Sequence, residues 1–199
     1  MSLFPLFLKL RGRKCLVVGA GKISEGKIVG LLAAGAKVTV VAPSATEKIQ
    51  SWRRAKKIVW KKKPYAPGDL RGALLVVAST NSHKVHRRIF RDAQKLGVLC
   101  NIVDVPDLCD FYYPSVVRRG ELQIAVSTAG ASPSLAKLLR QRFEREFGPE
   151  YAAWLAHLRN RRKEIRAMKI PLGEKNRRLE EIAGPAAFQE FLRQEQAGQ

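Results

Sequence analysis

The segment Gly19-Ala20-Gly21 lies between an apolar run and a stretch with helical spacing, an arrangement that can hold a dinucleotide. The first glycine permits a tight turn, and the second lets the backbone approach a pyrophosphate closely. The helix that follows offers free N–H groups to the phosphates. Ser24 stands where a third glycine is usual, and its small size suits the packing of a helix on a strand. The expected contacts to the cofactor come from Gly19, Ala20, Gly21, Lys22, Ile23 and Ser24.

The ends of the second and fourth expected strands should complete this cofactor site. The second strand ends at Ala42-Pro43, with no Asp or Glu for a ribose hydroxyl and no Arg placed for a 2′-phosphate. These residues therefore leave the choice between NAD and NADP open. Pro43 is expected to contact the cofactor on the ribose side. Ser79, Thr80 and Asn81 follow the fourth strand and are expected on the nicotinamide side. Helix capping is the alternative role for these three residues, and the two roles are compatible.

Asp104 directly follows the apolar run CNIV, at the edge where open parallel sheets bind ligands. A carboxylate there can take a proton from a substrate, directly or through water. The alternative is an aspartate that only forms a turn before Pro106. Asp107 and Asp110 are weaker candidates for the same role.

Strands that alternate with helices of about 10–15 residues predict a parallel sheet with right-handed crossovers. After Asp104 the pattern changes to a hairpin around Arg119-Gly120, a helix opened by Ser132-Pro133, and a helical, strongly basic tail. The expected strands cover 14–18, 37–43, 58–63, 73–80 and 98–103, and the expected helices before the hairpin cover 22–34, 44–52 (capped by Ser44) and 83–97.

Charge is the unusual feature of the composition. The 199 residues contain 37 Lys and Arg but only 17 Asp and Glu, a formal net charge of +20. This surplus implies a polyanionic partner: nucleic acid, an acidic membrane surface, or a ligand with many carboxylates or phosphates. No apolar run approaches the ~20 residues that span a bilayer. Residues 1–14 lack the features of a signal peptide, so a cytoplasmic protein is expected.

The cysteines and histidines are expected to be structural. Cys15, Cys100 and Cys109 have neither zinc-site nor CxxC spacing, which favours reduced thiols. His83 and His86 are one helical turn apart but lack a third ligand, so both are interpreted as exposed helix histidines, and His157 likewise. No resident metal site is therefore predicted.

Several longer segments resemble one family. FPLFLKLRGRKCLVVGAGKISEGK, VVASTNSHKVHRRI and CNIVDVPDLCDFYYPSVVRRGELQIAVSTAGASPSLAKLLR are similar to the precorrin-2 dehydrogenases, the NAD-dependent module of siroheme synthesis. This module is found alone or fused to a methyltransferase. The resemblance is colinear over about residues 3–145.

The resemblance implies NAD-dependent oxidation of precorrin-2 to sirohydrochlorin, and in some members insertion of ferrous iron, which would be transient here. It implies Asp104 as the catalytic carboxylate at the mouth of the cleft. It also implies a homodimer and a polycarboxylate tetrapyrrole substrate, which would account for part of the basic charge. The family's small-residue loop beside the substrate corresponds to Ser127, Thr128, Gly130 and Ser132, for which helix capping is the alternative.

The predicted architecture is an α/β fold with a Rossmann-type NAD-binding domain (1–112), a β-hairpin and helix dimerisation region (113–147), and a basic helical domain (148–199). A competing hypothesis is an NAD(H)-sensing regulator that binds nucleic acid through the basic helical tail. No helix-turn-helix, zinc finger or interleaved aromatic stripe supports it. Nucleic acid and membrane are therefore not expected as partners.

Overall fold

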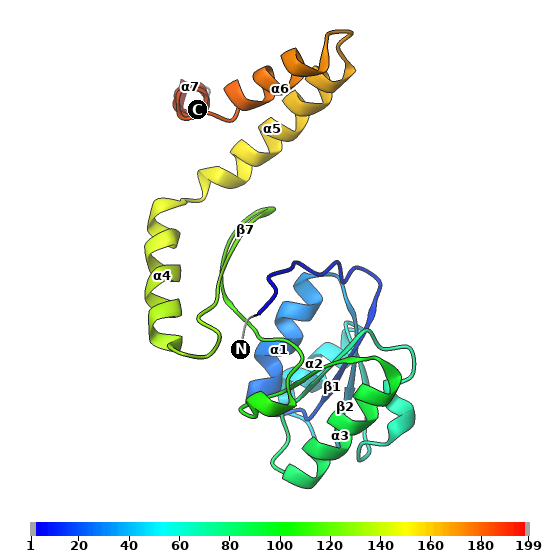
Figure 1. The fold of residues 1–199 in the computed structure, drawn as a ribbon. Coiled ribbons are helices and arrows are strands. Elements are labelled where there is room, and N and C mark those ends of the chain that lie inside the picture. Colours follow the sequence, from blue (N-terminus) through cyan, green and yellow to red (C-terminus); the bar gives the residue numbers. More distant parts are fainter. Residues whose placement is uncertain (1–2, 198–199) are drawn as a thin grey trace. The chain divides into compact units, whose positions relative to one another are not determined.

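The computed structural model describes residues 3–197, and its first half is a five-stranded parallel sheet (Figure 1). The strand order is β3-β2-β1-β4-β5. The predicted α/β fold with a Rossmann-type sheet is confirmed. The strands are β1 (Lys14–Val18), β2 (Lys37–Val41), β3 (Val59–Lys61), β4 (Leu75–Ala78) and β5 (Leu99–Ile102).

The central strand β1 is buried on both sides because helices cover both faces of the sheet. Cys15 and Val17 pack on the face covered by α1 (Lys22–Ala33) and α2 (Glu47–Arg54). Leu16 and Val18 pack on the opposite face, which α3 (His83–Leu96) and the short 3₁₀ helix η1 (Pro67–Leu70) cover. The uninterrupted apolar sequence of β1 follows from this double burial.

The start of α2 differs from the prediction. Its N-cap is Thr46, whose side chain accepts a hydrogen bond from the Ile49 amide at 3.4 Å, and not Ser44. The Thr46 amide donates to the carbonyl of Ala20 at 3.1 Å. The cap therefore lies where α2 is tied to the loop after β1, a tertiary contact that local sequence does not reveal.

The remainder of the chain contains the predicted hairpin and four helices. Its contacts make it a second compact unit, separated from the first between Tyr112 and Tyr113. At the hairpin turn Gly120 has a φ of +57°, and a Cβ there would lie 3.1 Å from the Cβ of Ala152. The elements are β6 (Ser115–Arg119), β7 (Leu122–Val126), α4 (Pro133–Glu146), α5 (Glu150–Ala167), α6 (Leu172–Glu181) and α7 (Pro185–Ala197).

Aromatic side chains hold α5 against α7. Trp154 packs on Phe188 and Phe191, with ring centroids 5.5 and 5.1 Å apart. His157 stacks on Trp154 at 5.4 Å with an interplanar angle of 9° and is half-buried. The interpretation of His157 as an exposed helix histidine is therefore wrong, since the side chain belongs to this aromatic cluster.

The surplus of positive charge is larger in residues 1–112 than in the basic tail. Residues 148–199 contain ten Lys and Arg and seven Asp and Glu, and several of these arginines form ion pairs within their own helices. Residues 1–112 contain 21 Lys and Arg and only seven Asp and Glu. The tail thus keeps a formal net charge of +3, and residues 1–112 carry +14. No helix among residues 3–197 is long and apolar enough to cross a membrane.

Candidate functional site

The strand order reverses between β1 and β4, and ligands of open α/β sheets bind at such a point, beyond the carboxyl ends of the strands. Gly19 follows β1, and Ser79 follows β4 directly beside it. Gly19 has a φ of +101°, and a Cβ on it would lie 2.4 Å from the backbone oxygen of Ser79. Only glycine fits this position.

Ser24 fixes the same turn from α1. Its side chain is fully buried, and its hydroxyl donates to the carbonyl of Gly19 at 2.9 Å. The Ser24 and Ser79 hydroxyls are 2.6 Å apart. Because Ser24 uses its one proton on Gly19, Ser79 is the donor in this second bond. These bonds link the loops after β1 and β4, and the sequence predicted only the small size of Ser24, not the bonds.

The N-terminus of α1 fits a dinucleotide pyrophosphate. Gly21 is the N-cap, and no side chain caps the free N–H groups of the first turn. A Cβ on Gly21 would meet no protein atom within 4 Å, so the space above these amides is open. Uncapped amides and the positive end of the helix dipole favour a phosphate in that space.

The residues that directly follow β2, where the ribose is expected, include no carboxylate. After β2, Ala42 is buried and its carbonyl accepts a 3.0 Å hydrogen bond from the Trp60 indole, while Pro43 is exposed. Lys61 and Lys63 donate instead to Asp69, at 3.0 and 2.6 Å. Burial raises the pKa of Asp69, but hydrogen bonds from Lys63, Lys61 and the Ala66 amide outweigh burial and hold that pKa below its usual range.

The loop after β4 caps the helix that follows it. Ser82 caps α3 by accepting a hydrogen bond from the Val85 amide, and the Thr80 hydroxyl accepts from the Ser82 amide, both at 3.4 Å. Asn81 is exposed and Thr80 is half-buried. Capping is therefore the role of Ser82, while contact of Ser79, Thr80 and Asn81 with the nicotinamide stays a prediction.

His86 lies beneath this loop. It is buried, whereas an exposed histidine was predicted. Its side chain is buried on the inner face of α3, and neither ring nitrogen makes a well-formed hydrogen bond. Burial lowers the pKa of His86, and the nearby charge of His83 lowers it further, whereas the backbone carbonyl of Thr80 acts in the opposite direction. His83 itself is exposed, as predicted.

Asp104 lies in the turn that leaves β5, at the same edge of the sheet as Gly19 and Ser79. Its φ is +61°, a left-handed conformation uncommon for any residue other than glycine and better tolerated by Asp and Asn than by most. The Val105 amide closes this turn on the carbonyl of Ile102 at 3.2 Å. The side chain is exposed, so the carboxylate is accessible to a ligand.

A buried amide and a thiol support this turn. Asn101 is buried in β5 and its amide donates to the carbonyl of Phe111 at 2.7 Å. The Cys109 thiol donates to the carbonyl of Ile102 at 3.1 Å. These bonds fold the segment after Asp104 back onto the end of β5. The sequence analysis assigned no role to Asn101.

Lys27 is a further residue that the sequence analysis missed. It lies on α1 one turn after Ser24 and is half-buried. Burial lowers the pKa of Lys27, and the negative charge of Asp104 opposes this shift. The ammonium group of α1 and the carboxylate after β5 therefore share one electrostatic environment, and only the packing of α1 brings them together.

The remaining thiols are structural, as predicted. Cys15 and Cys100 are free and fully buried. Burial raises the pKa of Cys15 to about 11 and that of Cys100 to about 12, which suppresses thiolate chemistry. Among residues 3–197 no three His, Cys, Asp or Glu side chains are grouped to hold a metal ion.

The small-residue loop belongs to the second unit. The Thr128 hydroxyl donates to the carbonyl of Ser132 at 3.0 Å and accepts from its amide at 3.1 Å, and the Ser132 hydroxyl caps α4. The Ser127 hydroxyl accepts from the Ala129 amide at 3.2 Å. Capping is thus confirmed for Ser132, while Ser127 and Gly130 are exposed. Substrate contact by this loop stays a prediction.

Several known proteins are similar to this chain in sequence and in fold. Residues 6–115 match a protein family described as putative NAD(P)-binding, and residues 119–146 match one described as sirohaem biosynthesis protein central. The siroheme synthase of Nitrosococcus oceani is 37% identical over 177 residues, covering 85% of this chain and 38% of the relative. The siroheme synthase of Nitrosomonas europaea is 36% identical over 203 residues, covering 100% of this chain and 42% of the relative.

The chain thus spans about two fifths of the length of these curated relatives. A solved structure titled SirC, precorrin-2 dehydrogenase, superposes with a TM-score of 0.77 and 29% identity, covering 96% of this chain and 98% of the other. The resemblance drawn from the sequence is confirmed. With more than half of its residues matched to the NAD(P)-binding family, the chain belongs to the family of SirC and of the N-terminal part of siroheme synthases.

Proposed function

We propose that this protein is a precorrin-2 dehydrogenase, which oxidises precorrin-2 to sirohydrochlorin and reduces NAD. The observation that carries the proposal is a carboxylate, Asp104, at the same sheet edge as a glycine turn built for a dinucleotide. The likeness to SirC over nearly the whole chain supports this assignment.

Oxidation of the ring removes a hydride and a proton from the substrate. The bound cofactor supplies the hydride acceptor. The Asp104 carboxylate accepts the proton, directly or through water, and its exposure leaves it accessible to a ring carbon or pyrrole nitrogen. The Ser24–Gly19–Ser79 bonds hold the cofactor loop rigid during turnover.

NAD is the proposed cofactor in preference to NADP. A 2′-phosphate requires a free cation beside the ribose. Lys61 ends the neighbouring strand β3 and Lys63 lies just after it, but their ammonium groups are held by Asp69. Pro43 offers no donor, so the ribose side favours a hydroxyl over a second phosphate.

The substrate carries acetate and propionate arms, which we propose are bound by cations near the cleft and by the loop 127–132. Ser127 and Gly130 are the exposed residues of this loop, and Thr128 and Ser132 fix its shape through their own hydrogen bonds. The three free thiols suit a reducing compartment, consistent with a cytoplasmic enzyme.

A homodimer is also proposed. The hairpin β6–β7 pairs with no further strand among residues 3–197, and α4 and α5 pack against it. On α4, Leu135 and Leu138 are 47% and 62% exposed and lie one turn apart on one face. A second copy of the chain that packs on this face of α4 would bury both leucines.

We expect the double variant Leu135→Glu/Leu138→Glu to sediment as a monomer, since burying two carboxylates in an apolar interface is strongly unfavourable. The wild-type protein should sediment as a dimer in the same analytical ultracentrifugation run. Leu172→Glu is the matched control, because Leu172 is 73% exposed on α6 and should tolerate the charge. A wild-type monomer, or a double variant that stays dimeric, would contradict the proposed interface.

Anaerobic incubation of the protein with precorrin-2 and NAD is expected to yield sirohydrochlorin and NADH in equal amounts, measured by absorbance. NADP should support turnover at least about tenfold less well, a difference of ~1.4 kcal/mol in transition-state stabilisation. Absence of any spectral change would refute the dehydrogenase assignment. Ferrous iron added to sirohydrochlorin in a separate reaction tests metal insertion independently.

The charge distribution does not favour the competing regulator hypothesis. It requires a strongly basic helical tail, yet residues 148–199 have ten Lys and Arg against seven Asp and Glu and pair Arg161, Arg177 and Arg193 within their own helices. Salt-dependent DNA binding without turnover of precorrin-2 would revive it.

A further inference from the structure

The amino ends of the strands carry cations that the proposed reaction does not use. Arg13 directly precedes β1, and Lys14 is its first residue. Lys37 is the first residue of β2, the strand paired with β1. Arg11 and Arg71 precede two of the turns at this edge. All of these residues lie at the edge of the sheet opposite to Gly19, Ser79 and Asp104, because the five strands are parallel.

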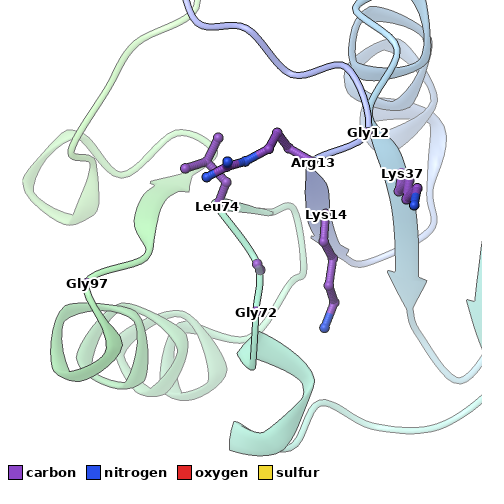
Figure 2. Close-up of a pocket in the computed structure, with 8 residues that line it drawn as sticks. Gly12, Arg13, Lys14, Lys37, Gly72, Leu74 and Gly97 are labelled. Atoms are coloured by element: carbon purple, nitrogen blue, oxygen red, sulfur yellow. The ribbon is translucent and has the colours of Figure 1, made fainter.

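Three of the cations line one open depression of about 470 Å³. Figure 2 shows Arg13 and Lys14 leaving the start of β1 in different directions, Arg13 toward Leu74 and Lys14 toward the turn at Gly72. This volume is within the range of small-molecule sites. The full lining is Gly12, Arg13, Lys14, Lys37, Gly72, Ala73, Leu74 and Gly97.

No carboxylate lines this depression. Within residues 3–197, the ion pairs found include none with Arg13, Lys14 or Lys37. The nearby carboxylate of Asp69 is occupied by Lys61 and Lys63. The ammonium group of Lys14 donates to the backbone carbonyls of Asp69 at 3.3 Å and Arg71 at 2.5 Å, which holds it over the Gly72 turn.

We propose that this depression at the amino edge of the sheet, lined by Arg13, Lys14 and Lys37, binds a small anion with several phosphate or carboxylate groups. Like charges held together in a fold repel one another, and an anion with two or more charges relieves that repulsion. The planar guanidinium of Arg13 is suited to bidentate binding of either group. Glycines at three points of the rim add no side chain that would keep an anion away from the cations.

A small anion fits this site better than nucleic acid. Arg13, Lys14 and Lys37 all line one depression, whereas a nucleic acid backbone requires phosphate contacts along an extended track. Lys14 is also held in place by its two carbonyl contacts, which favours a ligand of defined geometry. The site is separate from the dinucleotide loop, so the inference is independent of the proposed function.

Thermal unfolding of the full chain with sodium tripolyphosphate or citrate, at constant ionic strength, tests the site. Saturating anion should raise Tm by about 5–10 °C, the shift expected at a hundredfold excess over Kd. Isothermal titration should give one site per chain. The two probes distinguish phosphate from carboxylate ligands, and saturating NAD in both titrations keeps the dinucleotide loop filled.

The variant Arg13→Gln/Lys37→Gln should lose the Tm rise and bind the anion at least tenfold more weakly, while dehydrogenase activity is unchanged. Lys163→Gln/Lys169→Gln removes the same charge from exposed positions in the second unit and should keep the full response. Equal responses of the two variants, or no rise in the wild type, would overturn the proposal. Duplex DNA that displaces tripolyphosphate and binds more tightly would replace it with a nucleic acid surface.

Discussion

Replacing Asp104 with asparagine is expected to lower kcat by about 10²- to 10⁴-fold, the usual contribution of a positioned general base. The amide cannot accept the substrate proton, but it has nearly the same size and shape. Asparagine also tolerates the left-handed φ of +61° that this turn requires. The loss of activity should therefore occur in a folded protein.

Single-turnover kinetics with precorrin-2 and isothermal titration with NAD measure the two effects separately. NAD affinity and Tm should be nearly unchanged, since Asp104 is exposed and lies in the loop after β5. Asp107→Asn is the matched control, because Asp107 lies in the 3₁₀ helix η2 (Pro106–Leu108) and should be dispensable. If Asp104→Asn loses NAD binding instead, Asp104 contributes to the cofactor site and is not the base.

The dinucleotide site was predictable from sequence because its requirements are local. The apolar run of β1, the two glycines and the helical spacing after them lie within about twenty residues. The edge position of Asp104 followed from the same alternation of strands and helices. Ser24 was predictable by size but not by chemistry, since its hydrogen-bond partner Ser79 is 55 residues away in sequence.

Features that depend on tertiary packing were predicted wrongly or missed. Thr46, not Ser44, caps α2 because its amide contacts Ala20. His86 is buried because α3 turns that side toward the sheet, which two histidines at helical spacing do not reveal. The pairing of arginines in the tail with glutamates of α6 and α7 was missed because it depends on which side chains share a helix face.

Gly19→Ala is expected to abolish NAD binding and to destabilise the first unit. Alanine at a φ of +101° costs about 1–3 kcal/mol, and its Cβ would lie 2.4 Å from the Ser79 oxygen, so the loops after β1 and β4 must separate. That movement breaks the Ser24 and Ser79 bonds. Denaturant unfolding and titration with NAD measure the two losses.

Gly21→Ala separates cofactor binding from folding. A Cβ on Gly21 meets no protein atom, so the free energy of unfolding should change by less than about 1 kcal/mol. The same methyl group projects into the space assigned to the pyrophosphate, and NAD should bind at least about tenfold more weakly, a loss of ~1.4 kcal/mol. Normal NAD affinity in Gly21→Ala would mean that the phosphates lie elsewhere. Gly19 would then be a turn residue required only by the Ser79 backbone.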